Sequence, residues 1–293
     1  MQIYFDPGYC LSSQAFDTFR KACEVAKDLE RRPVPGVVLR SPEKATRDDL
    51  LLAHDVEYVD AVATGEPFDL ARSNTVGWDE GLFDATSWST GGAITATLEA
   101  FRSGSITGSL SSGLHHARVE AGNGYCTFNG LAIASIRARL AGAARVLILD
   151  LDAHCGGGTA SIIAGREGIE QVDVSVNGFD RYRPTLNAKQ VMASADDYLE
   201  VVRGELDAIV DPAGVSVMIY NAGMDPHENA GGVAGITSAM LEEREQMVFE
   251  WASRHGIPTA FVLAGGYRMG SDSMDEVVAL HRLTIETAAR AAA

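Results

Sequence analysis

The chain has 293 residues, 46% of them hydrophobic, and a formal net charge of −16 at pH 7. This hydrophobic content is enough for a buried core, so we expect a folded chain and exclude a largely disordered one. The acidic excess argues against nucleic acid as a partner, because neutralising phosphates requires clustered Lys and Arg.

Cysteine usage and the first residues bear on the cellular compartment. The chain contains four cysteines, at positions Cys10, Cys23, Cys126 and Cys155. They include no CxxC pair and no regular framework, so we expect all four to be reduced. Residues 1–10 lack the basic and apolar regions of a signal peptide, and no run of about 18 apolar residues occurs. We therefore expect a cytoplasmic protein of bacterial type that does not bind a membrane.

In chain order, a loop precedes the first long helices. Residues 66–81, EPFDLARSNTVGWDEG, are expected to form a loop near the functional edge of the fold. Periodic apolar residues predict helices over 85–104 and 128–142. Two further helices are predicted over 236–256 and 273–293. The first of them ends at Gly256, and Pro258 follows two positions later.

Three apolar runs between these helices have a common pattern. Residues 144–154 (ARVLILDLDAH), 216–225 (SVMIYNAGMD) and 258–267 (PTAFVLAGGY) are each apolar and end in Gly, Asp, His or Tyr. Continuous apolar runs are typical of parallel strands buried on both faces. No linker or repeat divides the chain, so we predict one α/β domain over 1–293, a three-layer α/β/α fold with a mainly parallel central sheet.

Polar side chains at the ends of two of these strands predict a metal site. Asp150, Asp152 and His154 alternate along one strand end and should share a face. Asp152, His154 and Asp225 supply the three protein ligands of a catalytic zinc site, because ligands gather at the carboxyl ends of parallel strands. Asp150 is then available to orient an imidazole.

Two adjacent histidines supply the proton chemistry that such a site needs. His115 and His116 lie between glycines in SSGLHHARVEAGNGYCTFN. Metal-assisted amide hydrolysis needs a base for the water proton and an acid for the leaving nitrogen, and we assign these tasks to His115 and His116. Tyr267 is the expected hydrogen-bond donor to the oxyanion, and Gly265 and Gly266 let the backbone come close to the substrate.

These motifs resemble the zinc-dependent histone deacetylase and acetylpolyamine amidohydrolase superfamily, which has the arginase-deacetylase fold. The resemblance runs from residues 48–65 to Tyr267, most of the chain. It implies the same zinc ligands, the same histidine pair, Asp150 as the partner of His115, and Tyr267 as the group that polarises the carbonyl. It further implies Tyr125 in the wall of the acyl tunnel.

The resemblance also implies a potassium ion, held by backbone carbonyls around Asp150 to His154 and by the hydroxyl of Ser175. The implied substrate is an acyl-lysine, an acetylpolyamine or a small-molecule amide. A homodimer is possible for such a chain.

The sequence departs from the family pattern at Cys155, Gly157 and Asn177 and in residues 12–22, where many relatives have an HPERP-like segment. Where relatives read HHGNGT, this chain reads HCGGGT, so that Gly157 replaces the polar residue that supports the second histidine. We therefore expect His116 to lack its usual partner. Asn177 stands where relatives usually have histidine. Cys155 is expected to be an inert small hydrophobe.

Two other functions are compatible with parts of the sequence, and the remaining histidines have other expected places. An arginase-like or agmatinase-like enzyme would need two manganese ions and additional aspartates. A catalytically weakened protein that binds an acylated ligand is motivated by Gly157. His54 is expected to be structural and His227 to lie in a loop at the rim, whereas His255 and His281 are expected on helix surfaces.

Overall fold

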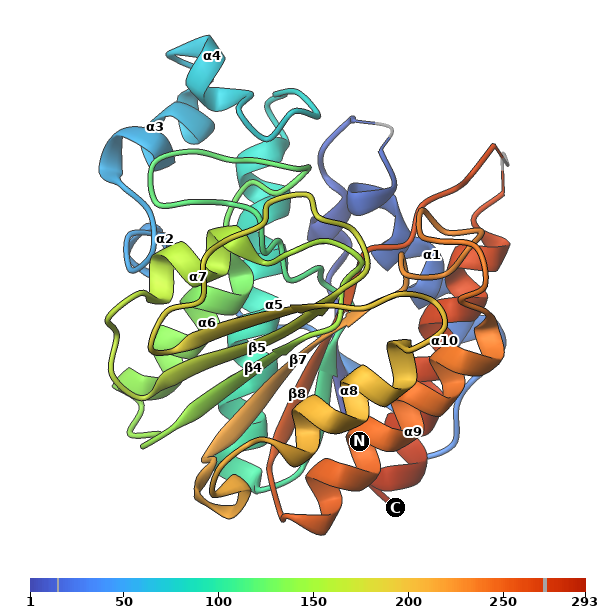
Figure 1. Ribbon diagram of the computed structural model, residues 1–293. Coiled ribbons are helices and arrows are strands. Elements are labelled where there is room, and N and C mark those ends of the chain that lie inside the picture. Colours follow the sequence, from blue (N-terminus) through green and yellow to red (C-terminus); the bar gives the residue numbers. More distant parts are fainter. Residues whose placement is uncertain (15, 271–272) are drawn as a thin grey trace.

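The computed structural model describes residues 1–14, 16–270 and 273–293. Within these residues, eight strands form one parallel sheet in the order β2-β1-β3-β8-β7-β4-β5-β6 (Figure 1). The strands are β1 (Gln2–Tyr4), β2 (Val38–Arg40), β3 (Ile106–Ser109), β4 (Val146–Asp150), β5 (Ile169–Ser175), β6 (Ala188–Met192), β7 (Val217–Gly223) and β8 (Thr259–Ala264).

Both faces of this sheet are buried, as the continuous apolar runs predict. In β4, Val146 and Ile148 pack into the hydrophobic cluster on one face, and Leu147 and Leu149 pack into the cluster on the other face. Successive side chains of a strand point to opposite faces, so a strand that is apolar at every position needs helices on both sides.

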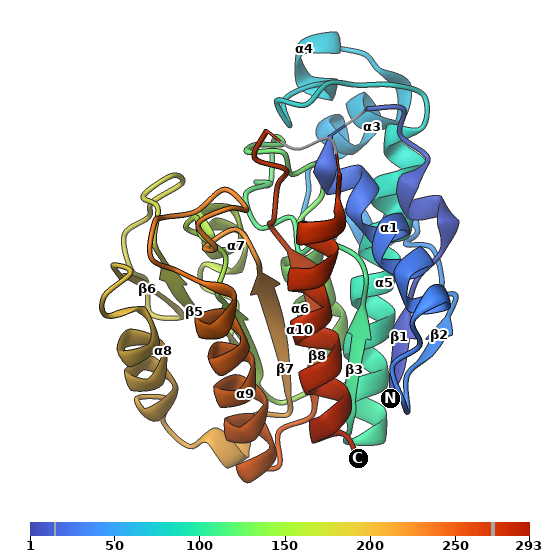
Figure 2. The ribbon, with the colours of Figure 1, turned by 90° about the vertical axis from the view of Figure 1, so that its right-hand side faces the viewer.

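Helices cover the two faces in separate layers (Figure 2). One layer contains α1 (Asp17–Arg31), α8 (Tyr198–Asp207), α9 (Ser238–Arg254) and α10 (Asp275–Ala291). The other contains α5 (Leu82–Ser103), α6 (Gly130–Leu140) and α7 (Gly157–Ile163), with α2 (Arg47–Leu50) and α3 (Val56–Thr64) beside them. The short α4 (Phe68–Ala71) lies at the top of both views, beyond the carboxyl ends of the strands. This arrangement is the predicted three-layer α/β/α fold.

The four long predicted helices and the three predicted strands are all present, as α5, α6, α9 and α10 and as β4, β7 and β8. The sequence did not predict the strands β1, β2, β3, β5 and β6. β1, β2 and β3 have only three or four residues, and β5 and β6 carry polar side chains among their apolar ones. The predicted loop over 66–81 contains α4, and Thr75 within it lines the cavity described below.

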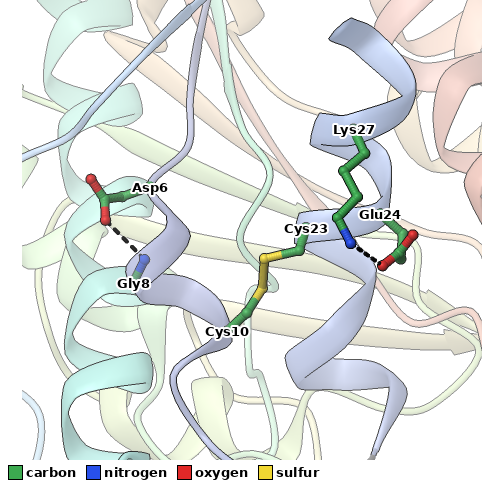
Figure 3. The surroundings of a disulfide bond; sticks show 6 residues. All are labelled: Asp6, Gly8, Cys10, Cys23, Glu24 and Lys27. Carbon is green, nitrogen blue, oxygen red and sulfur yellow. Dashed lines mark hydrogen bonds and ion pairs between the residues drawn. A yellow bond between two sulfur atoms is a disulfide. The ribbon is translucent and has the colours of Figure 1, made fainter. Parts of the chain in front are cut away.

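A disulfide links Cys10 and Cys23, whose Cα atoms are 6.6 Å apart (Figure 3). It joins the short 3-10 helix η1 (Pro7–Cys10) to α1. The expectation that all four cysteines are reduced is therefore wrong for this pair. Their spacing matches no short motif, and only the packing of η1 against α1 brings the two residues within bridging distance. Cys126 and Cys155 are free and buried.

His281 is fully buried, so its predicted place on a helix surface is also wrong. It lies on α10, which packs against both α9 and α1 and therefore has little exposed surface. A helix that packs against only one other helix has a wider exposed, polar face.

None of the helices in the described part of the chain is long and apolar enough to cross a membrane.

Candidate functional site

The predicted metal ligands meet at the carboxyl ends of two neighbouring strands. Asp152 and His154 follow β4, and Asp225 follows β7, which is paired directly with β4. One ligand atom from each residue lies within 4.8 Å of the others. His154 Nδ1 is 3.1 Å from Asp152 Oδ1 and 3.1 Å from Asp225 Oδ2.

The chemistry of this donor set fits a divalent cation. Asp225 is fully buried, and its Oδ2 has an ion-pair contact with His154 Nδ1 but no aligned hydrogen bond among the described residues. Burial and the nearby charge of Asp152 raise the pKa of Asp225, as expected for two carboxylates buried side by side. An imidazole and two carboxylates are the ligands that zinc accepts, with a fourth position left open.

The tandem histidines lie beside the predicted ligands and are supported from behind. His115 Nδ1 donates to Asp150 Oδ2 at 2.8 Å, and Asn221 Nδ2 donates to Asp150 Oδ1 at 2.7 Å. The Nε2 atoms of His115 and His116 are 3.0 Å apart, so one proton between them completes a hydrogen bond. Asn221 was not predicted, because no motif identifies an asparagine inside the buried strand β7.

His116 has a carboxylate partner, contrary to the expectation drawn from Gly157. Its Nδ1 lies 3.0 Å from Asp180 Oδ2. Asp180 comes from the loop between β5 and β6 and also contacts Arg118. The sequence reveals no signal for this pairing, because Asp180 stands 64 positions away from His116 in an irregular segment.

The two imidazoles differ in proton affinity. Burial lowers the pKa of His115, but the charges of Asp150 and Asp152 more than offset it and raise the pKa to about 10. For His116, burial and the neighbouring His115 lower the pKa to about 4, against the opposing effect of Asp180. A cation bound by Asp152 would offset part of that carboxylate's charge and so would lower the pKa of His115 from this value.

Aromatic side chains line the approach to this centre. A cavity of about 460 Å³ opens over His116 and His154. Its wall includes Tyr125, Phe179 and Tyr267. Tyr125 has a positive φ of 68°, which turns its ring toward Tyr267 at a centroid distance of 5.9 Å. Phe179, which the sequence did not single out, places its ring edge-to-face with that of His116 at 4.9 Å.

Tyr267 and Gly265 line a smaller inner cavity of about 20 Å³ that also includes both tandem histidines and Asp152. Burial, together with the charges of Asp225 and Asp152, raises the pKa of Tyr267, so its hydroxyl keeps the proton that it would donate. Gly265 has a φ of 51°, and a Cβ there would overlap the carboxylate of Asp225. Glycine at this position therefore leaves room for the carboxylate of Asp225.

A buried lysine reaches the same inner cavity from α1. Lys21 Nζ donates to the carbonyl oxygen of Gly265 at 2.5 Å. Burial lowers the pKa of Lys21 to about 8, against the opposing charges of Asp225 and Asp152. Sequence reasoning missed Lys21 because a lysine in an amphipathic helix is usually solvated.

The potassium site implied by the resemblance stays a prediction. The hydroxyl of Ser175 donates to Asp173 Oδ1 at 2.5 Å, and Asp173 is buried next to Asp150. His54 has the structural role expected from the sequence, since its Nδ1 donates to Arg118 O at 2.7 Å. His227 lies in a loop, as expected, but it is buried and not at the rim, with its Nε2 3.0 Å from the Ser238 hydroxyl.

Sequence comparisons place the chain among deacetylases. A profile of the histone deacetylase domain matches residues 14–283. An uncharacterised protein of Picosynechococcus sp. is 30% identical over 241 residues, 77% of this chain and 77% of that protein. A probable deacetylase of Methanothermobacter thermautotrophicus is 29% identical over 77% of this chain and 73% of that protein. Histone deacetylase 2 of Arabidopsis thaliana is 27% identical over 78% of this chain and 63% of that protein.

Solved structures show the same fold. The HD domain of HDA15 matches with a TM-score of 0.80 and 21% identity, over 99% of this chain and 89% of that chain. Acetylpolyamine aminohydrolase from Burkholderia pseudomallei matches with a TM-score of 0.78 and 19% identity, over 98% of each chain. The predicted arginase-deacetylase-like architecture is thereby confirmed.

Proposed function

The chain belongs to the histone deacetylase family, whose members hydrolyse linear amide bonds, and from this premise we propose that it is a zinc-dependent enzyme that removes an acyl group from an amine. The observation that carries the proposal is the meeting of Asp152, His154 and Asp225 beside two imidazoles, each with its own carboxylate. When bound, zinc supplies a Lewis acid that polarises the carbonyl and lowers the pKa of water. A potassium ion near Ser175 would be structural.

Oxyanion stabilisation and proton transfer are then the tasks of this chain's own residues. Tyr267 donates a hydrogen bond to the carbonyl oxygen as negative charge develops. We propose that His115 takes the proton of the water and that His116 donates a proton to the leaving nitrogen, as expected from the sequence. Asp150 keeps the Nδ1 proton of His115 in place.

The cavity supports an acylated amine with a slender apolar linker as the substrate. Tyr125 and Phe179 provide flat apolar walls, and Thr75, Asn123 and Asn177 add uncharged polar groups at the mouth. Acyl-lysine, acetylpolyamine and small-molecule amides remain the three proposed substrate classes. We also propose a homodimer and a cytoplasmic location. The disulfide between Cys10 and Cys23 argues against the cytoplasm, because that compartment is reducing.

The two rival functions lose support. An arginase-like site needs two metal ions, whereas the described residues offer one cluster of three ligands. The binding-only alternative depended on an unsupported His116, and Asp180 supplies that support.

The first test is hydrolysis of acetyl-lysine peptides, acetylated polyamines and small acyl amides by zinc-loaded protein, with Asp225→Ala as the blank. We expect turnover of one class and its loss in the blank, together with one zinc per chain by elemental analysis. No turnover of any class by protein that holds one zinc would contradict the proposal. Two manganese ions per chain would favour the arginase-like alternative.

A further inference from the structure

The segment after His154 explains why glycine stands at position 157. Here α7 begins at Gly157, directly beside the loop that carries Asp180. A Cβ on Gly157 would overlap the carbonyl oxygen of Asp180 and lie 2.8 Å from its Cγ. Any side chain at position 157 would therefore displace Asp180 from its place.

Asp180 is held tightly in the space that Gly157 leaves. Its side chain is 3% exposed, and Oδ2 accepts hydrogen bonds from His116 Nδ1 at 3.0 Å and from Gly158 N at 3.1 Å. Oδ1 contacts the guanidinium of Arg118. The backbone of Asp180 has a φ of 58°, in the left-handed region that aspartate tolerates better than most residues. Three donors from two segments, the histidine loop and the start of α7, thus fix one carboxylate.

The resulting geometry matches that behind the other histidine. His115 Nδ1 meets Asp150 Oδ2 at 2.8 Å, and His116 Nδ1 meets Asp180 Oδ2 at 3.0 Å. In each case the carboxylate holds the proton on Nδ1 and leaves Nε2 facing the cavity. The two histidine–carboxylate pairs differ in that Arg118 offsets part of the charge of Asp180.

We propose that Asp180 is the positioning residue of His116, supplied by the β5–β6 loop in place of a polar residue at position 157, and that Gly157 is required to admit it. The proposal rests on the proposed amide hydrolysis. It assigns Asp180 no contact with substrate. Asp180 acts through the orientation and tautomer of His116, so its loss should affect turnover more than substrate binding.

The first experiment compares kcat and KM for zinc-loaded wild type, Asp180→Asn and Asp180→Gly. We expect kcat to fall by roughly 10–100-fold with KM changed less than about threefold, as for other carboxylates that orient an imidazole. Asp60→Asn is the matched control, because Asp60 also pairs with an arginine, Arg47, but on α3 and away from the imidazoles. A kcat for Asp180→Gly within about threefold of wild type would overturn the proposal.

A swap tests whether positions 157 and 180 act as a pair. The double variant Gly157→Asp/Asp180→Gly moves the carboxylate to the start of α7. We expect its kcat to exceed that of Asp180→Gly by at least about tenfold, whereas Gly157→Asp alone stays low because the two side chains compete for one space. A double variant no faster than Asp180→Gly would contradict the pairing. Zinc content and thermal unfolding of each variant show whether it is folded.

A readout without turnover separates this inference from the proposed function. In protein with 15N-labelled histidine, a proton on His116 Nδ1 that is bonded to a buried carboxylate should give a downfield resonance, assigned by its loss in His116→Asn. We expect the resonance to disappear in Asp180→Gly and to persist in Asp60→Asn. If wild type hydrolyses nothing but the resonance depends on Asp180, the proposed function fails and the positioning stands. A resonance unchanged in Asp180→Gly would overturn the positioning.

Discussion

His115 and His116 are adjacent in sequence and similarly buried, yet their surroundings give them different proton affinities. Behind His115 stands Asp150, and Asp152 lies 3.5 Å from its Nε2, so two carboxylates favour the charged ring. The carboxylate behind His116 is shared with Arg118. The difference in proton affinity between the two rings therefore follows from neighbours that come from distant segments.

The acid and base roles of His115 and His116 can be tested with substrates whose leaving amines differ in basicity. An aryl amine departs without a proton donor more readily than an alkyl amine, so a variant that lacks only the acid should recover on an acyl anilide. We expect His116→Ala to lose about 100-fold or more on an alkyl amide and much less on the anilide, and His115→Ala to lose activity on both. The opposite pattern would make His115 the acid and His116 the base.

Tyr267 is expected to act on the transition state alone. Removing its hydroxyl in Tyr267→Phe deletes one oxyanion donor, which typically lowers kcat by about 100–1000-fold. The aromatic contacts with Phe16 and Tyr125 remain, so we expect zinc content and KM to change little. Steady-state kinetics with elemental analysis checks both. A variant with full kcat would show that Tyr267 only lines the cavity.

At the scale of elements, His54 connects the segment after α2 to the histidine loop. Its Nδ1 donates to Arg118 O, and its Nε2 accepts a hydrogen bond from the backbone N of Asn129, the N-cap of α6. Both bonds require the neutral ring. Burial lowers the pKa of His54 to about 4, against the raising effect of the backbone bond to Arg118.

The folded chain should therefore lose stability on mild acidification. Between pH 6.5 and about 4, the unfolded chain takes up a proton on His54 that the folded chain does not take up. The free energy of unfolding therefore decreases as the pH decreases, and at pH 4 this group alone lowers it by about 3 kcal/mol. Urea unfolding of wild type and His54→Gln measures the slope. Equal slopes in the two proteins would show that His54 does not contribute.

The disulfide is a second link between elements. It closes a loop across 13 positions between η1 and α1, and α1 also carries Lys21 into the inner cavity. We expect the double variant Cys10→Ser/Cys23→Ser to be less stable by about 3 kcal/mol in chemical unfolding, because a cross-link of this length restricts the unfolded chain. Wild type treated with a reductant should unfold at the same denaturant concentration as this variant. Unchanged stability in both would contradict a structural role for the bond.

At the scale of the molecule, one sheet brings the reacting groups together. Both chain termini lie at the end opposite the site, and β4, β7 and β8 deliver Asp152, Asp225 and Tyr267 to the same edge (Figure 2). Because a single sheet spans the chain, we also propose one domain over 1–293, which should unfold in one cooperative transition.

Zinc should stabilise this whole unit. A ligand that binds only the folded chain adds about 2.7 kcal/mol at one hundred times its Kd. We expect zinc to raise the Tm of metal-free wild type and a chelator to reverse the change. Asp225→Ala should show no zinc-dependent shift. An equal shift in that variant would place the binding site elsewhere.

The sequence by itself determined the long helices, the central strands and the residues that end them, because burial on both faces requires apolar runs and strand ends place Asp152, His154 and Asp225 together. Only the tertiary structure decided the partners of those residues. Asp180, Lys21 and the bond from Cys10 to Cys23 come from loops and helices whose local sequence has no distinctive pattern. Their roles depend on which segments pack side by side, and periodicity does not determine that.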